Sequence, residues 1–363
     1  MAVKYLAGER LIGTAAERTA LSGNTLGSIA QTSWKELDRV TLGSAGDVLD
    51  TGTFAAKDNL MILLHITGTT APYPILTFNN DTGSNYAIRF SNNGANDGSN
   101  HSQAGLDHST GGTVQLDHFA TFTIRNIGSE EKLVIGHTVE QEATGAGTAP
   151  NRKEIVGKWA NTANQITRVE LTNSRSGHDF ASGSEMVILG CDDDEADSGT
   201  NFWQELGTDT LDSADQISSG TITAKKYIFG EFHATGSENT GSRPRLRFNN
   251  DTGNTYASRF NNNGGSDETP STSYGSMYIS ESDMNEGCLA TFFIVNVSNK
   301  EKLAIYESVR LSATGSGNIP QRFEGTGKWA NTSAQITEID VIGSNVPALP
   351  FDSGTSIRVW GSD

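Results

Sequence analysis

The hexapeptide FNNDTG at residues 78–83 recurs unchanged at residues 248–253, which lie 170 positions further along the chain. Agreement at this spacing continues through the rest of a domain-sized stretch. A nearly constant spacing over such a length indicates a duplication rather than a shared short motif. The sequence therefore predicts two copies of one domain. The other matching pairs are EKL at 131–133 and 301–303, GKWANT at 157–162 and 327–332, and QIT at 165–167 and 335–337.

The repeat also sets the expected domain boundaries. Trp34 and Trp203 stand at the beginnings of the two copies. A chain of 363 residues commonly forms two domains, and units of this size can each bury a core without metals or disulfides. The predicted parts are an N-terminal arm at 1–33 without a second copy, a first unit at 34–190, an acidic linker at 191–202 and a second unit at 203–363.

Within each unit, short apolar stretches alternate with turn-forming clusters. Residues 120–124 and 132–139 predict a hairpin, and residues 290–295 and 303–309 predict its counterpart. The sequence NDTG at 80–83 predicts a second tight hairpin turn. About eight strands are expected in each unit, the number typical of a jelly roll. No long apolar stripe with helical spacing is present. The fold class is therefore expected to be all-β, with two tandem, homologous, jelly-roll-like β-sandwich domains and an N-terminal arm.

Charge and hydropathy exclude several classes of protein. The formal net charge is −17, and no cluster of Lys and Arg interrupts the acidity. Duplex DNA repels such a surface, so no nucleic-acid partner is expected. The apolar runs are too short to cross a membrane, and residues 1–30 lack the apolar core of a signal peptide. Cys191 and Cys288 occupy non-equivalent places in the two copies, which predicts thiols rather than a framework disulfide.

No motif for catalysis stands out. The chain has no nucleophile elbow, no P-loop, no HExxH and no CxxC, and its 43 acidic residues single out no glycosidase pair. We therefore expect a protein that is not an enzyme and has no resident cofactor. Asp81 and Asp251 offer oxygen ligands to Ca²⁺, but the EF-hand ligand spacing is missing and a tight turn is the favoured interpretation.

Six side chains are candidates for contact with a glycan or a receptor. Trp159 and Trp329 could stack on sugar rings, although a Trp present in both copies more often anchors a core. Tyr86 and Tyr256 carry the same ambiguity. His101 and His108 share a polar, glycine-rich stretch at 95–112, which predicts a long exposed loop. A metal site at these histidines is disfavoured, because the matching stretch at 265–275 has no histidine.

Three sequence segments resemble those of the β-sandwich virion proteins of tailed phages, especially marine ones. They are FNNDTGSNY at 78–86, GKWANT followed by QIT at 157–167, and SGSEMVILG at 182–190. The resemblance covers both repeat units, and it carries no catalytic motif. It implies a capsid decoration or cement protein, or a tail appendage such as a tail fibre, exposed on the virion.

The same resemblance implies partners and a location. The partners would be other virion proteins and further copies of the chain, in a homotrimer or a larger symmetric array. The protein would be made in the host cytoplasm without a signal peptide and would act on the extracellular particle. The alternative is a receptor-binding or glycan-binding tail-fibre module, in which paired domains give avidity to a host surface glycan.

The N-terminal arm falls outside the resemblance. Its first residues mix apolar and charged side chains, and free termini are usually disordered unless something ties them down. We expect the arm to dock onto a neighbouring subunit, and assembly to use this arm together with the edges of the sandwiches. The candidate docking residues are Tyr5, Leu6, Arg10, Leu11 and Ile12.

Overall fold

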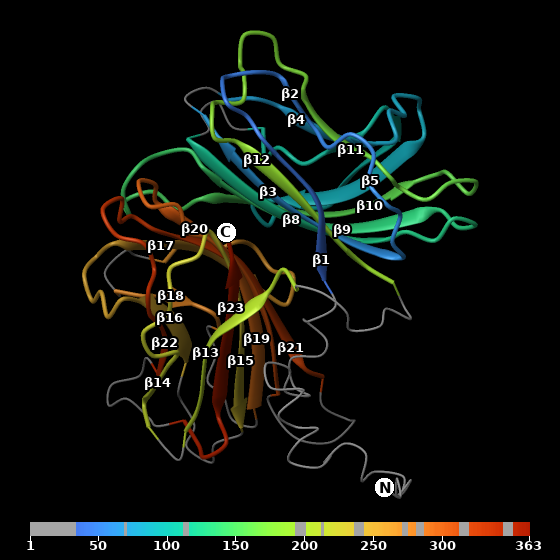
Figure 1. Ribbon diagram of the computed structural model, residues 1–363. Helices are drawn as coiled ribbons and strands as arrows, with labels where there is room; N and C mark the ends of the chain where they lie inside the picture. Colours follow the sequence, from blue (N-terminus) through green and yellow to red (C-terminus); the bar gives the residue numbers. More distant parts are fainter. Residues whose placement is uncertain are drawn as a thin grey trace, which may run out of the picture.

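The computed structural model shows an all-β protein built from two β-sandwiches in tandem (Figure 1), as the sequence predicts. The described residues form strands and turns and no helix, and so they contain nothing helical that could span a bilayer. The predicted arm and most of the predicted linker lie outside the described residues. The structure describes residues 34–68, 71–111, 116–192, 201–211, 214–235, 243–270, 275–280, 287–311, 319–343 and 351–363.

The first unit pairs a large sheet with a small one. The large sheet has eight strands in the order β1-β12-β3-β8-β9-β10-β5-β6, and the small sheet has four in the order β2-β11-β4-β7. The strands are β1 (Lys35–Thr41), β2 (Val48–Asp50), β3 (Asn59–Thr67), β4 (Pro74–Phe78), β5 (Tyr86–Asn92), β6 (Gly98–Gln103), β7 (Leu106–Asp107), β8 (Asp117–Arg125), β9 (Lys132–Gln141), β10 (Asn151–Trp159), β11 (Val169–Asn173) and β12 (Glu185–Cys191).

The second unit repeats this strand order. Its sheets run β13-β23-β15-β19-β20-β21-β17 and β14-β22-β16-β18, so that among the described residues only β6 lacks an equivalent. The strands are β13 (Gln204–Thr210), β14 (Gln216–Ser218), β15 (Tyr227–Thr235), β16 (Pro244–Phe248), β17 (Tyr256–Asn262), β18 (Met277–Tyr278), β19 (Gly287–Val295), β20 (Lys302–Leu311), β21 (Gln321–Trp329), β22 (Ile339–Gly343) and β23 (Ser356–Ser362).

The predicted hairpins β8–β9 and β19–β20 are confirmed. Their registers pair Ile124 with Val134 and Ile294 with Ala304. The inward-facing side chains of these strands fill a separate core in each sandwich, between its large and small sheets. The two cysteines are not joined by a disulfide, as predicted.

The hairpin predicted at residues 80–83 is wrong. Strands β4 and β5, on either side of that turn, belong to different sheets, so the chain crosses the sandwich here instead of returning beside itself. The tight turn lies slightly earlier, where Asn79 and Asn80 have φ of 53° and 57° and the Asp81 amide donates to the Phe78 carbonyl at 2.9 Å. Two consecutive residues with positive φ define a type I′ turn.

Buried polar contacts hold this corner in place. Trp159 Nε1 donates to Asp81 Oδ2 at 2.7 Å, and the Phe78 amide donates to the Tyr86 hydroxyl at 2.8 Å. The second unit repeats both bonds, with Trp329 on Asp251 and Phe248 on Tyr256. The repeated FNNDTG motif is therefore a crossing between sheets, tied to the GKWANT motif by one hydrogen bond in each unit.

Two further expectations need correction. The stretch 95–112 is not one long loop, because it contains β6 on the edge of the large sheet and β7 in the small sheet, where Leu106 is fully buried. The estimate of about eight strands per unit was also low, since the described residues hold twelve strands in the first unit and eleven in the second. The additional strands are short or polar and lack a clear apolar alternation.

Candidate functional site

The two sandwiches meet through the outer faces of their large sheets. Figure 1 shows the first unit lying across the ends of β15, β19 and β23. The contact is apolar and continuous, and we call it the junction cluster. It contains Met61, Leu63, Phe119, Val139, Val187 and Leu189 from the first unit, Phe202 from the end of the linker, and Trp203, Tyr227, Phe229, Val295, Leu303, Ile305 and Trp360 from the second unit.

A buried ion pair closes one side of the junction. Arg152 on β10 reaches Asp267 of the second unit, with Nε at 2.9 Å from Oδ2 and Nη2 at 2.6 Å from Oδ1. Both side chains are 3% exposed. Gly94 lies against Asp267, and a Cβ at Gly94 would collide with that carboxylate. The pair is therefore desolvated, bidentate and closely covered.

A second carboxylate, that of Glu185 on β12, accepts hydrogen bonds from both units. Lys226 Nζ lies 2.8 Å from Glu185 Oε1, and the Tyr227 hydroxyl donates to the same oxygen at 2.8 Å. Thr41 and Arg39 donate from the first unit at 2.7 and 3.1 Å. Burial alone would raise the pKa of Glu185, but the hydrogen bonds and charge of Lys226, supported by the other donors, hold that pKa below its ordinary value.

This arrangement makes stability at the junction depend on pH. Because the pKa of Glu185 is lower in the folded chain, its contribution is complete above the unfolded value of 4.5 and disappears as pH falls through the folded value. We expect Glu185→Gln to cost about 2 kcal/mol at pH 7 and progressively less below pH 4.5.

Urea unfolding of the parent chain and the variant across that pH window measures the difference. Glu205→Gln, which removes an exposed carboxylate from β13, should leave stability unchanged throughout. An equal loss for Glu185→Gln at every pH would contradict the assigned role of its charge.

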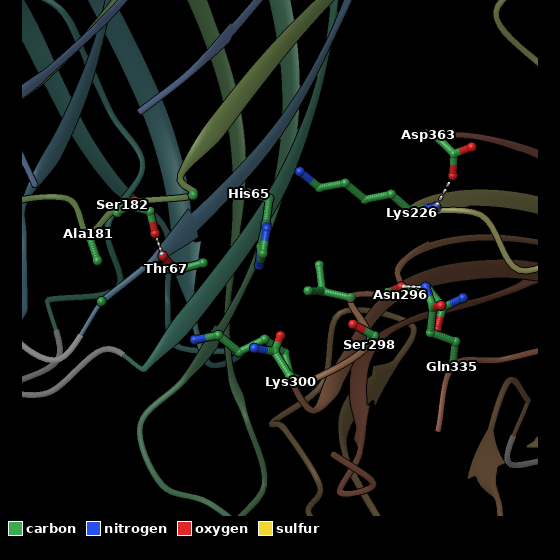
Figure 2. Close-up of a pocket in the computed structure, with 14 residues that line it drawn as sticks. His65, Thr67, Ala181, Ser182, Lys226, Asn296, Ser298, Lys300, Gln335 and Asp363 are labelled. Atoms are coloured by element: carbon green, nitrogen blue, oxygen red, sulfur yellow. Dashed lines mark hydrogen bonds between the residues drawn. The ribbon is translucent and has the colours of Figure 1, made fainter. Parts of the chain in front are cut away.

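A cavity of about 520 Å³ opens beside the junction cluster. Figure 2 shows the side chains of His65, Lys226 and Lys300 directed toward the same space, the first from β3 and the other two from the second unit. Asp117 Oδ1 lies 3.4 Å from both His65 Nε2 and Lys300 Nζ. Lys226, Lys300 and Asp363 thus line one cavity between the two units, and pockets between domains commonly take small ligands.

A separate polar cluster is buried inside the first sandwich. His118 Nδ1 lies 3.2 Å from Glu140 Oε1, and Lys153 Nζ donates to the Ser109 carbonyl at 2.8 Å. Burial lowers the pKa of Lys153, opposed by the charge of Asp107. The second unit has Cys288, Arg310 and Phe323 at the positions of His118, Glu140 and Lys153. This cluster borders none of the described cavities except through Lys153, so we assign it to packing.

The structure does not support surface contact by the predicted aromatic candidates. Trp159, Trp329, Tyr86 and Tyr256 are at most 2% exposed, and each Trp stacks on its Tyr with ring centroids 6.4 Å apart. These four side chains anchor the sheet crossings, in agreement with the interpretation that a Trp present in both copies anchors a core. They cannot serve as platforms for a sugar in this structure.

The structure also separates the two candidate histidines. His101 is exposed on β6, whereas His108 is fully buried and burial lowers its pKa well below the ordinary value. His108 is therefore not a surface contact either. Asp81 and Asp251 each use both carboxylate oxygens as acceptors for protein donors, as a structured turn requires. No group of three or more His, Cys, Asp or Glu able to hold a metal occurs in the described part of the chain.

The candidate arm residues Tyr5, Leu6, Arg10, Leu11 and Ile12 lie outside the described residues. Sequence reasoning missed the junction residues Arg152, Asp267, Glu185 and Lys226. The sequence holds only a partial signal for these residues. Arg152 and Asp267 are each repeated in the other copy, as Arg322 and Asp97, which marks the two positions as shared features of the domain.

Comparisons with known proteins give this chain no family. No family model matches it, and no curated protein matches it. Solved structures resemble it only weakly. They include mouse laminin α1 domains LG4-5 (9% identity, 90% of this chain and 89% of that chain, TM-score 0.16), the catalytic domain of PdAgaC (8%, 45% and 76%, TM-score 0.16) and β-agarase A in complex with oligoagarose (11%, 45% and 74%, TM-score 0.17). At such TM-scores these likenesses carry no argument about function.

Proposed function

We propose that this chain is a non-enzymatic structural protein exposed on a virus-like particle, as a capsid decoration protein or part of a tail appendage. The proposal has two supports. One is the resemblance of the repeated motifs to tailed-phage virion proteins. The other, which carries most of the argument, is the junction.

The junction joins two sandwiches into a single body. Apolar side chains from both large sheets are buried together, and the ion pair of Arg152 with Asp267 is removed from water. Domains that move freely usually meet through smaller and more polar contacts. A fixed relation between two binding bodies is what an assembling protein needs in order to present its surfaces at one constant angle.

Imaging of the assembled state tests this proposal. We expect the purified chain, examined by electron microscopy alone and with particles of a susceptible phage–host system, to form regular arrays or to decorate the particles. A chain that stays dispersed and binds no particle would contradict it. Release of reducing ends from host polysaccharide would contradict the non-enzymatic part.

A second candidate function is binding of a host surface glycan with acidic groups. The cavity beside the junction favours it, because His65, Lys226 and Lys300 all line that cavity. A glycan array separates the two candidates: saturable binding that Lys300→Ala abolishes supports the receptor role. The half-buried Lys35 on β1 offers a matched control, since Lys35→Ala removes a charge that does not line the cavity.

A further inference from the structure

The polar cluster inside the first sandwich brings an amine and a carboxylate together between the two sheets. Lys153 lies on β10 of the large sheet and is 1% exposed, and Asp107 ends β7 of the small sheet. Lys153 Nζ lies 3.2 Å from Asp107 Oδ2, and the Asp107 side chain is 20% exposed. Because Oδ2 is bonded to Cγ, the amine lies beside the carbon with which it could form an amide.

Ser109 and Tyr73 hold both groups in position. The Ser109 carbonyl accepts a hydrogen bond from Lys153 Nζ at 2.8 Å, and the Ser109 amide donates to Asp107 Oδ1 at 2.9 Å. The Tyr73 hydroxyl donates to Asp107 Oδ2 at 2.8 Å. The amine and both oxygens of the carboxylate are thus oriented by neighbouring groups, as in a preorganised reaction site.

Burial makes the charged form of this pair costly. An ammonium group that leaves water loses its hydration, and an adjacent carboxylate returns only part of that free energy. Burial lowers the pKa of Lys153, although the negative charges of Asp107 and Glu140 oppose that change. The Lys153 proton can therefore pass to Asp107 Oδ2, which leaves a neutral amine beside a neutral carboxylic acid.

We propose that Lys153 and Asp107 join in an isopeptide bond between the two sheets of the first sandwich. The neutral Lys153 Nζ uses its lone pair to attack Asp107 Cγ, and the bond from Cγ to Oδ2 then breaks. Oδ2 leaves as water with two of the three protons of the original ammonium group, and the third proton stays on the amide nitrogen. The ammonium and the carboxylate contain every atom of both products, so the step needs no oxidant and no co-reactant.

The two oriented donors act on different oxygens during this step. The Ser109 amide stabilises the negative charge that develops on Oδ1 in the tetrahedral intermediate, as an oxyanion-hole donor does. The Tyr73 hydroxyl donates to the leaving oxygen, Oδ2. Both donors are in hydrogen-bond contact with these oxygens before the reaction starts.

The product removes the cost of the buried charges. A neutral amide replaces two charged groups, so no ion pair has to stay away from water. The bond also closes the chain between residues 107 and 153, which restricts the unfolded state as a disulfide does. Cys191 and Cys288 are not joined to each other and supply no such restraint.

The second unit has different residues at the corresponding places. Phe323 stands at the position of Lys153, and strand pairing puts Tyr278 at the position of Asp107. We therefore expect one isopeptide bond per chain, in the first sandwich alone. The bond concerns the strength of one domain, so it goes beyond the proposed assembly function and stands or falls independently of it.

Mass spectrometry of the purified full chain tests for the bond. The intact parent chain should be lighter than its sequence mass by one water molecule, and a protease digest should yield a branched peptide in which Lys153 is joined to Asp107. An intact chain at its full sequence mass would show that the bond does not form. So would a water loss confined to a linear peptide, such as a succinimide at Asp97 before Gly98.

Three variants identify the reacting groups. Lys153→Met and Asp107→Ala each remove one group, so both should keep the full sequence mass and give no branched peptide. Lys158→Met is the matched control, because Lys158 lies 2.7 Å from Glu131 in an ion pair whose side chains are 44% and 40% exposed. This variant should still lose one water molecule. A branched peptide that survives Lys153→Met, or one that disappears in Lys158→Met, would overturn the assignment, and the mass of the parent chain decides the matter even if a core variant fails to fold.

Discussion

Replacing Arg152 with alanine should lower the free energy of unfolding by about 3–5 kcal/mol, the usual cost of leaving one member of a buried ion pair behind. Asp267 is 3% exposed and would be left buried without Arg152, its closest cation. Arg259 Nη1 is 3.9 Å from Asp267 Oδ2, too distant to replace a bidentate hydrogen bond. Chemical denaturation at neutral pH, monitored by circular dichroism, measures this loss.

The duplication supplies a matched control. Arg322 occupies the equivalent position on β21 and is 59% exposed, so Arg322→Ala should change the stability of the dilute chain by no more than about 0.5 kcal/mol. Removing both charges of the buried pair should cost less than removing Arg152 alone, because the Asp267 carboxylate no longer stays behind; Glu154, the other partner of Arg152, is 23% exposed. Equal losses for Arg152→Ala and Arg322→Ala would show that the junction is not closed as described.

Truncating either core tryptophan should have an effect of similar size. We expect Trp159→Ala and Trp329→Ala each to cost about 3–5 kcal/mol through lost apolar contact and the cavity left behind. Because the junction cluster couples the sandwiches, each substitution should lower one shared unfolding transition in calorimetry. Two separated transitions, of which only the mutated unit's moves, would contradict the coupling.

A milder substitution separates packing from the hydrogen bond. Trp329→Phe keeps a large ring but removes the donor to Asp251, so the expected loss is smaller, about 1–2 kcal/mol. Trp159→Phe should give a closely similar value, since its bond to Asp81 has the same length of 2.7 Å. A marked difference between the two variants would mean that the repeated corners are not energetically equivalent.

The sequence predicted the all-β class and the β8–β9 hairpin because these depend on local signals. Alternating side chains at 120–124 report one buried face, and the following turn fixes the pairing. The crossing at Asp81 was mistaken for a hairpin, since its turn residues are the same in both cases. Only the partner strands distinguish them, because β4 pairs with β11 and β5 pairs with β10, both far along the chain.

One sequence pattern reflects the junction, but it does not identify the surface that covers the strand. Residues 60–64 on β3 are apolar without interruption, and Met61 and Leu63 face the second unit while their neighbours face the core. A strand covered on both faces shows this pattern. The sequence does not say what covers the second face, because contacts between units depend on geometry rather than on local order.

The positions of the five tryptophans have a spectroscopic consequence. Trp159 and Trp329 have nearly superimposable surroundings, so their emission should overlap and report on the two interiors jointly. Trp203 and Trp360 lie in the junction cluster, with Trp34 packed beside it. If only the emission of this second group shifts to longer wavelength, the sandwiches have separated while each remains folded. The intrinsic tryptophan fluorescence of the chain can therefore report that separation without an added dye.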